Sequence, residues 1–164
     1  MAESSFDIEA GADLQEVDNA LNQAAREVRQ RWDFKDTDTV IEWTGEREGI
    51  KVESNSEGRV DAAVEVLRDK FLKRKVSLKV MEVGDHQPVS GGRTRVDVGL
   101  VTTLTPELAK RIVKDVKATK LKVTPTNMGD QVRVSGKKRD DLQAIQKLVR
   151  DNDYEAPLRF TNYR

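Results

Sequence analysis

Four stretches of the chain carry apolar residues at the three- and four-residue spacing of an amphipathic helix. The first begins at Asp13, where Glu16 three residues later completes a capping-box pattern, and the third begins at Thr105-Pro106-Glu107. The faces expected to be buried are Leu14, Val17, Leu21, Ala24, Val28 and Trp32; Val60, Val64, Leu67 and Phe71; Leu108, Ile112, Val113 and Val116; and Leu142, Ile145, Leu148 and Val149.

Between these helices, shorter segments alternate apolar and polar residues, as strands do. The expected strands are 5–9, 39–44, 50–53, 76–80, 93–104, 120–124, 131–135 and 158–163. Segment 84–92 has the Gly, Ser and Pro content of a linker. The order β-α-β-β-α-β therefore occurs twice, once on each side of this segment.

Two such units predict an α+β protein made of two ferredoxin-like sandwiches. Each would be a four-stranded antiparallel sheet with two helices on one face. We expect an acidic domain over 1–84, a linker over 85–92 and a basic domain over 93–164. One alternative stays open: the first and last strands could pair with each other, which would move strand one into the second domain.

The charge distribution sharpens this division. The net charge is zero, but residues 1–88 carry 13 Lys and Arg against 20 Asp and Glu, whereas residues 89–164 carry 16 against 9. Halves of −7 and +7 suggest different tasks. The basic half could receive a phosphate-bearing ligand, or the two halves could dock on each other as an interaction module.

The most cationic turn of the basic half lies between a predicted strand and a predicted helix. Lys137, Lys138 and Arg139 occupy it. Unpaired N–H groups and the helix dipole favour anions at such a helix start, so the turn is a candidate phosphate seat. In the competing interpretation, Asp140 and Asp141 in the first helical turn already neutralise it.

Strand alternation predicts a second cationic surface. If Val96, Val98, Val132 and Val134 face the helices, Arg95 and Arg133 point the other way, and Lys122 does the same on its strand. In ferredoxin-like order the first and third strands are central neighbours, so these three cations would cluster on the open face. Alternatively, they merely keep an exposed sheet soluble.

Catalysis has little support in the sequence. His86 is the single histidine and falls in the linker, cysteine is absent, and no residues have metal-ligand or P-loop spacing. We therefore expect no catalytic residue, no metal and no cofactor. The first three strands of the second unit lack aromatic residues, so a compact phosphate-rich ligand fits better than stacked RNA.

Several segments resemble the YajQ family of bacterial proteins. They are Ser5-Phe6-Asp7-Ile8, Arg31-Trp32-Asp33-Phe34-Lys35, Lys120-Leu121-Lys122-Val123, Gly136-Lys137-Lys138-Arg139-Asp140-Asp141-Leu142-Gln143 and Leu158-Arg159-Phe160-Thr161-Asn162-Tyr163-Arg164. Family members more often have Phe in place of Trp32, and many have Ser-Gly-Lys where this chain has Ser90-Gly91-Gly92-Arg93.

The resemblance implies two domains of the fold argued above, no enzymatic activity, and binding of nucleotides or nucleic acid. Some family members are described as cyclic di-GMP receptors. We accordingly expect a non-enzymatic nucleotide-binding protein, with RNA as the alternative partner. No apolar run is long enough for a signal core or a membrane span, so a cytoplasmic protein is expected. We also expect a monomer.

Overall fold

A computed structural model describes residues 3–164 and divides the chain into two compact units. One unit is continuous and covers Ala12–Val101. The other joins the segment that ends at Gly11 to Thr102–Arg164. The chain therefore leaves one unit after a single strand, completes the other, and then returns.

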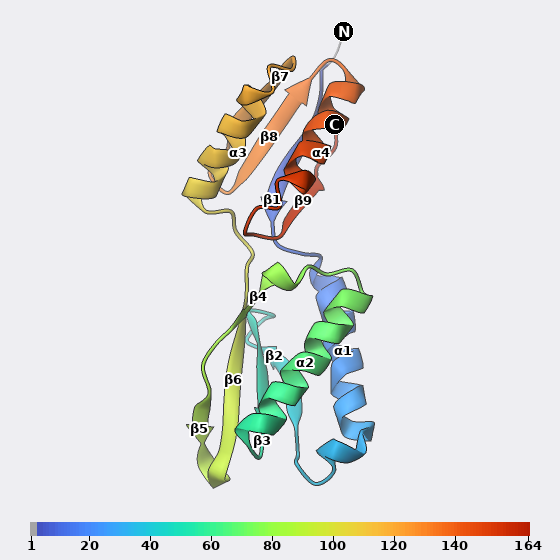
Figure 1. The fold of residues 1–164 in the computed structure, drawn as a ribbon, viewed down its shortest axis with the longest axis vertical. Coiled ribbons are helices and arrows are strands. Elements are labelled where there is room, and N and C mark those ends of the chain that lie inside the picture. Colours follow the sequence, from blue (N-terminus) through green and yellow to red (C-terminus); the bar gives the residue numbers. More distant parts are fainter. Residues whose placement is uncertain (1–2) are drawn as a thin grey trace. The chain divides into compact units, whose positions relative to one another are not determined.

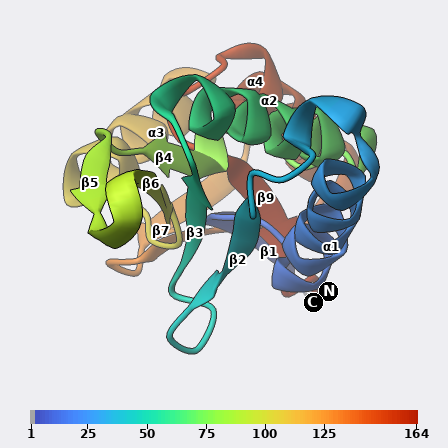
Figure 2. The same ribbon diagram turned by 90° about the horizontal axis from the view of Figure 1, so that it is seen from below.

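The continuous unit contains two helices and one antiparallel sheet. Its sheet has the order β2-β3-β6-β4, with β5 also paired to β6. Both helices cover the same face of this sheet (Figures 1 and 2). The elements are α1 (Leu14–Gln30), β2 (Val40–Thr44), β3 (Gly49–Ser54), α2 (Glu57–Lys73), β4 (Met81–Val83), β5 (Gln87–Val89) and β6 (Arg93–Leu100).

The discontinuous unit has the same plan. Its antiparallel sheet has the order β7-β8-β1-β9, so the blue strand β1 lies between the orange β8 and the red β9 (Figure 1). The elements are β1 (Ser4–Ala10), α3 (Pro106–Ala118), β7 (Val123–Asn127), β8 (Gln131–Gly136), α4 (Arg139–Asp151) and β9 (Leu158–Thr161).

The predicted fold class is confirmed, since both units are ferredoxin-like sandwiches of helices on an antiparallel sheet. Strand β1 does pair with β9, with Ile8 opposite Phe160, which is the alternative that the sequence left open. Strand β6 makes the reciprocal move and pairs with β3, with Val52 opposite Val96. Relative to the expected halves, β1 and β6 have exchanged sheets.

This exchange corrects the expected domain limits of 1–84 and 93–164. Alternation identifies which face of a strand is buried but not which sheet receives it. Both first strands bury apolar residues on one face, namely Phe6 and Ile8 in β1 and Val96 and Val98 in β6. This burial pattern is compatible with β1 or β6 joining either of the two sheets.

The exchange also reduces the charge difference. The discontinuous unit carries 14 Lys and Arg against 11 Asp and Glu, for a net charge of +3, and the continuous unit carries 15 against 18, for −3. Strand β1 brings acids into the basic half, and β6 takes Arg93 and Arg95 out of it. The electrostatic reason to expect docking of two strongly charged halves is therefore weaker.

The predicted core residues Leu67, Phe71, Ile112 and Leu142 are all buried. The predicted face of the first helix was wrong at both ends, because Leu14 and Trp32 are exposed. Helix α1 ends at Gln30, Arg31 is extended, and Trp32–Phe34 forms a 3₁₀ turn, so the helical phase is lost before Trp32.

Several strand limits also differ from the prediction; for example, β6 ends at Leu100 and β7 begins at Val123. Segment 76–80 ends in a 3₁₀ turn, Leu78–Val80, and the strand follows at β4. The expected linker contains β5, which turns back along β6 through Gly91 and Gly92, both at positive φ. Residues 87–89 of the expected linker are therefore part of a sheet.

Candidate functional site

Three of the six predicted phosphate-binding cations line a single hollow of about 490 Å³. Lys137 and Lys138 come from the turn between β8 and α4, and Lys122 comes from the residue before β7. We call this the lysine hollow. Glu3 and Asp141 also line it, so its charged side chains sum to +1.

The start of α4 forms one side of the lysine hollow and has no capping side chain. The other three helices are capped by Asp13, Ser56 and Thr105, each of which accepts a hydrogen bond from a backbone N–H of its helix. At α4 the N-cap is Lys138, whose side chain makes no such bond. The Asp141 N–H donates to the Lys138 carbonyl at 3.1 Å, but the N–H groups of Arg139 and Asp140 have no capping side chain.

Arg139 lies one residue further on and lines a different hollow of about 420 Å³. This second cavity is bounded by the start of β1, one flank of α4 and the C-terminal residues. We call it the tyrosine hollow, after the exposed Tyr163. Its lining side chains include Phe6, Arg139, Leu142, Gln143, Gln146 and Tyr163.

Arg133 points to the face of its sheet opposite the helices, as alternation predicts. There its Nε donates to Oδ1 of Asp7 at 2.9 Å, and Nδ2 of Asn162 donates to Oδ2 of Asp7 at 2.8 Å. Asp7 is 0% exposed. Burial by itself raises the pKa of Asp7, but the hydrogen bonds from Arg133 and Asn162 outweigh it and lower the pKa. The Arg133 guanidinium is thus engaged in an internal ion pair.

Arg95 is not beside Arg133, and that prediction was wrong. Arg95 lies on β6 in the continuous unit, and its Nη2 is 2.7 Å from Oδ1 of Asp97. The central neighbour of β8 is β1, which places Asp7 rather than Arg95 opposite Arg133. The strand exchange therefore separates the expected second cationic surface.

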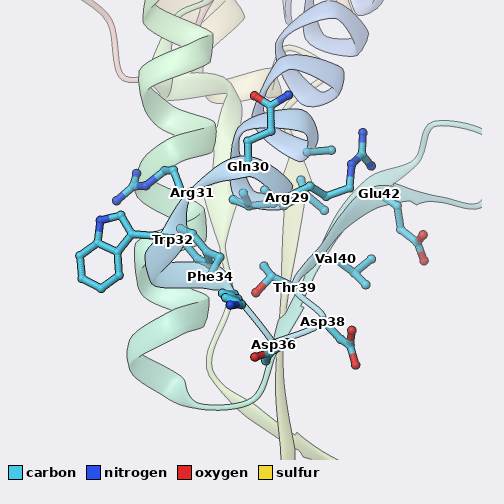
Figure 3. Close-up of a pocket in the computed structure, with 14 residues that line it drawn as sticks. Arg29, Gln30, Arg31, Trp32, Phe34, Asp36, Asp38, Thr39, Val40 and Glu42 are labelled. Carbon is cyan, nitrogen blue, oxygen red and sulfur yellow. The ribbon is translucent and has the colours of Figure 1, made fainter.

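A larger hollow of about 820 Å³ lies between the end of α1, the 3₁₀ turn and β2 in the continuous unit (Figure 3). Trp32 projects from its rim and is 87% exposed. The helical pattern had assigned this residue to the core. The charges of its lining side chains sum to zero, because three are basic (Arg29, Arg31 and Lys35) and three are acidic (Asp36, Asp38 and Glu42).

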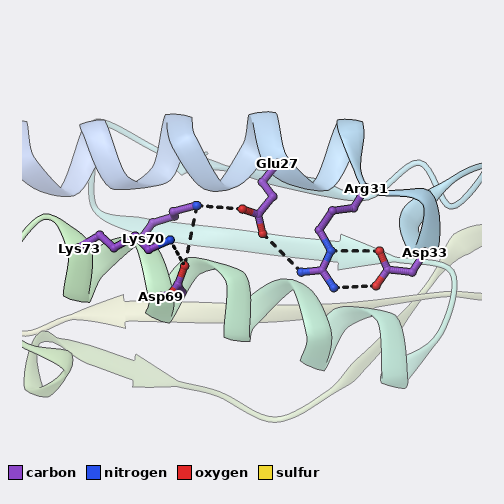
Figure 4. Close-up of polar contacts among 6 residues, drawn as sticks. All are labelled: Glu27, Arg31, Asp33, Asp69, Lys70 and Lys73. Atoms are coloured by element: carbon purple, nitrogen blue, oxygen red, sulfur yellow. Dashed lines mark hydrogen bonds and ion pairs between the residues drawn. The ribbon is translucent and has the colours of Figure 1, made fainter.

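Arg31 is already held by two acids (Figure 4). Its Nη2 is 2.8 Å from Oδ2 of Asp33, and its Nη1 is 3.4 Å from Oε2 of Glu27. Glu27 also links α1 to α2, with Oε1 at 2.8 Å from Nζ of Lys70. The hydrogen bond from Lys70 is the main cause of the lowered pKa of Glu27. This network stabilises the helix pair and engages Arg31, one of the three cations that line the larger hollow.

His86 is exposed and bonded to α2. Its Nε2 is 2.7 Å from Oδ1 of Asp61, and this hydrogen bond raises the pKa of His86. Within residues 3–164 no group of three or more His, Cys, Asp or Glu side chains is arranged to hold a metal ion. No helix in the same range is long and apolar enough to cross a membrane.

The fold and the lysine hollow together define a class: an α+β protein of two ferredoxin-like units, one of which presents lysines around an uncapped helix start. A family model described as "Nucleotide-binding protein YajQ-like" matches residues 4–164, and the chain belongs to this family.

Similar proteins cover the whole chain. A protein from Mycobacterium sp. (strain MCS) is 47% identical over 165 residues, with 100% of both chains covered. One from Mycolicibacterium gilvum is 48% identical over 165 residues, also with 100% of both covered. One from Thermobifida fusca is 46% identical over 164 residues, with 99% of both covered. Each is named "Nucleotide-binding protein".

Proposed function

We propose that this chain binds a nucleotide without converting it, and that the lysine hollow receives the phosphate. The observation that carries this proposal is the convergence of Lys122, Lys137 and Lys138 on one hollow beside the uncapped start of α4. Backbone N–H groups and ammonium groups together form the usual protein seat for a phosphate. The names of the similar proteins support the same ligand class.

A cyclic dinucleotide such as cyclic di-GMP is the particular ligand that we propose, following the family resemblance. It carries two phosphates in a compact ring. A compact ligand of this kind fits a local cationic hollow better than it fits an extended basic surface. Arg133 and Arg95 are each paired with an acid, which favours a site restricted to the α4 turn. RNA is the competing ligand, and the experiment below separates the two.

The test is isothermal titration of the full chain with cyclic di-GMP, GTP, ATP and a short RNA. The Lys137→Gln/Lys138→Gln variant should bind the nucleotide at least tenfold more weakly, with a flatter salt dependence, because two phosphate contacts are lost. Arg59→Gln is the matched control. Arg59 lies in the first turn of α2, at the corresponding strand-to-helix junction, where its N–H donates to the side chain of the N-cap residue Ser56.

Three outcomes would count against this proposal. Equal losses in the lysine variant and in Arg59→Gln would indicate general electrostatic attraction with no site at the α4 turn. Unchanged affinity in the lysine variant would place the ligand elsewhere. Binding to the RNA that greatly exceeds binding to every small nucleotide would replace the proposed ligand with a nucleic acid.

A further inference from the structure

The tyrosine hollow has no part in the phosphate contacts, but it has the features of a pocket for a planar ring. Phe6 and Leu142 are buried and form its apolar floor. Tyr163 is 66% exposed at its rim. A planar aromatic ligand buries its faces on such groups, and most small-molecule pockets combine apolar walls with a few polar groups.

Tyr163 is held in place from two sides. Its hydroxyl accepts a hydrogen bond from Nε2 of Gln146 at 3.2 Å, and its ring centroid lies 6.3 Å from that of Phe6. The following residue, Arg164, exchanges two backbone hydrogen bonds with Ser5, of 2.9 and 3.1 Å. The exposed ring is thus fixed before any ligand arrives, which lowers the entropy cost of stacking against it.

Polar groups complete the pocket. The Gln143 side chain is exposed and makes no hydrogen bond within residues 3–164, so its amide retains both donor and acceptor capacity. Donor and acceptor atoms on one group suit the edge of a nucleobase, which presents both kinds of atom. Arg139 adds a cation at the side of this hollow nearest to the lysines.

The two hollows are lined by consecutive residues at three places. Glu3 lines one and Ser4 the other, and the same holds for Lys138 with Arg139. A third adjacent pair, Asp141 and Leu142, repeats the pattern further along α4. Consecutive residues have Cα atoms about 3.8 Å apart, so the two hollows lie close together at the start of α4. A ligand that occupies both must carry an aromatic ring close to a phosphate.

We propose that the tyrosine hollow binds the base of the nucleotide whose phosphate lies in the lysine hollow. The base stacks on Tyr163, and Gln143 contacts its edge. This inference rests on the proposed function and adds a base-binding residue set to it. The shared chemistry is a nucleoside phosphate, which a free nucleotide, a cyclic dinucleotide or one unit of an RNA could supply.

The experiment compares ligands with and without a base. The full chain is titrated with cyclic di-GMP, GTP, a short RNA and inorganic tripolyphosphate. Tyr163→Ala should weaken binding of the base-containing ligand at least tenfold and leave tripolyphosphate affinity within twofold. Tyr163→Phe keeps the ring and should stay within threefold of the wild type. The preferred ligand among the three identifies the source of the base.

Trp32→Ala is the matched control, since Trp32 is even more exposed but lies in the other unit. It should change no affinity. If Trp32→Ala lost ligand affinity and Tyr163→Ala did not, the base would bind at Trp32 and the inference would be wrong. In the wild-type protein, nuclear Overhauser effects should connect base protons to the Tyr163 ring, and their absence in a saturated complex would also overturn it.

The two proposals fail differently. Suppose that Lys137→Gln/Lys138→Gln loses affinity for both the nucleotide and tripolyphosphate, while Tyr163→Ala keeps its affinity for both. The proposed phosphate site is then supported, and the proposed base pocket is wrong. If Tyr163→Ala loses tripolyphosphate as well, Tyr163 has a structural role and the base pocket is again wrong. If wild-type protein binds none of the four ligands, both proposals are wrong.

Discussion

Asp7 is the residue with the most unusual environment in the described part of the chain. It is a carboxylate with no solvent exposure on the sheet face opposite the helices. Arg133 and Asn162 both donate to it, and they come from β8 and from the residue after β9. Asp7 therefore connects three segments of the discontinuous unit through one side chain. Losing its charge should weaken all three connections together.

We predict that Asp7→Asn lowers the free energy of unfolding by about 1–3 kcal/mol, because Arg133 loses its carboxylate partner. Urea unfolding at pH 7 measures this. Glu9→Gln is the control two residues along the same strand face, where Arg159 is 3.8 Å from the carboxylate, and it should cost under about 0.5 kcal/mol. Equal costs for the two variants would contradict a special role for Asp7.

The same carboxylate predicts a pH dependence. The pKa of Asp7 is lowered in the folded state, so its contribution to stability is complete above the unfolded value of about 3.9. That contribution is lost as the pH falls through the lower, folded pKa. The stability difference between wild type and Asp7→Asn should therefore shrink on acidification below pH 4. A difference that is constant from pH 7 to pH 3 would be inconsistent with this linkage.

His86 offers a second titration with the opposite sign. Its pKa is raised by the hydrogen bond to Asp61, so the bond stabilises the protein below about pH 6.5 and weakens as the pH rises through the folded pKa. It is the single histidine, so its imidazole signals in an NMR titration are unambiguous. The pKa should lie above the ordinary value in wild type and fall in Asp61→Asn. No change on that substitution would show that the bond is absent in solution.

At the scale of elements, α4 combines a buried apolar face with an exposed polar flank. Leu142 is buried, and its neighbour Gln143 is exposed. We predict that Leu142→Ala lowers the free energy of unfolding by about 2–4 kcal/mol through lost burial and a residual cavity. Gln143→Ala should cost under about 0.5 kcal/mol. Thermal unfolding compares them, and coincident melting curves would show that the assigned helix face is wrong.

The sequence predicted helices well because their signals are local. The capping pattern correctly predicted that α3 begins at Pro106, and apolar periodicity correctly predicted the buried faces of α2 and α4. The prediction failed at Trp32, where one extended residue, Arg31, breaks the helical phase. No periodic pattern records such a break in advance.

The candidate site was predictable only in part. Lys137, Lys138 and Arg139 are adjacent in sequence, so their proximity needed no knowledge of the fold. The position of Arg95 depended on which sheet receives β6, a long-range choice that alternation does not encode. Tyr163, which we propose as a base-binding residue, was not predicted as one, because its place beside α4 depends on β1 pairing with the C-terminal segment.

At the scale of the whole molecule, the exchange of β1 and β6 means that neither expected half is a complete unit. The sequence 102–164 lacks the central strand of its own sheet, since β1 separates β8 from β9. The sequence 12–101 contains every strand of its sheet. The two segments should therefore differ sharply as isolated fragments.

We predict that fragment 12–101 gives a dispersed NMR amide spectrum and a cooperative melt, whereas fragment 102–164 gives neither. A permuted fragment that joins residue 164 to residues 3–11 through a flexible linker should recover both. The fragment 93–164 is the control, because it supplies β6 in place of β1. Cooperative folding of 102–164 without β1 would contradict the strand assignment.

The position of β1 in the sequence also delays its folding during synthesis. Asp7 leaves the ribosome 126 residues before its partner Arg133, and the whole of the continuous unit is synthesised in between. At about 5–20 residues per second, translation leaves β1 without its sheet for about 6–25 s. During that interval Phe6 and Ile8 have no core to enter. The acidic residues Glu3, Asp7 and Glu9 lie before, between and after these two apolar residues. Charged residues in such positions keep an exposed apolar strand from aggregating.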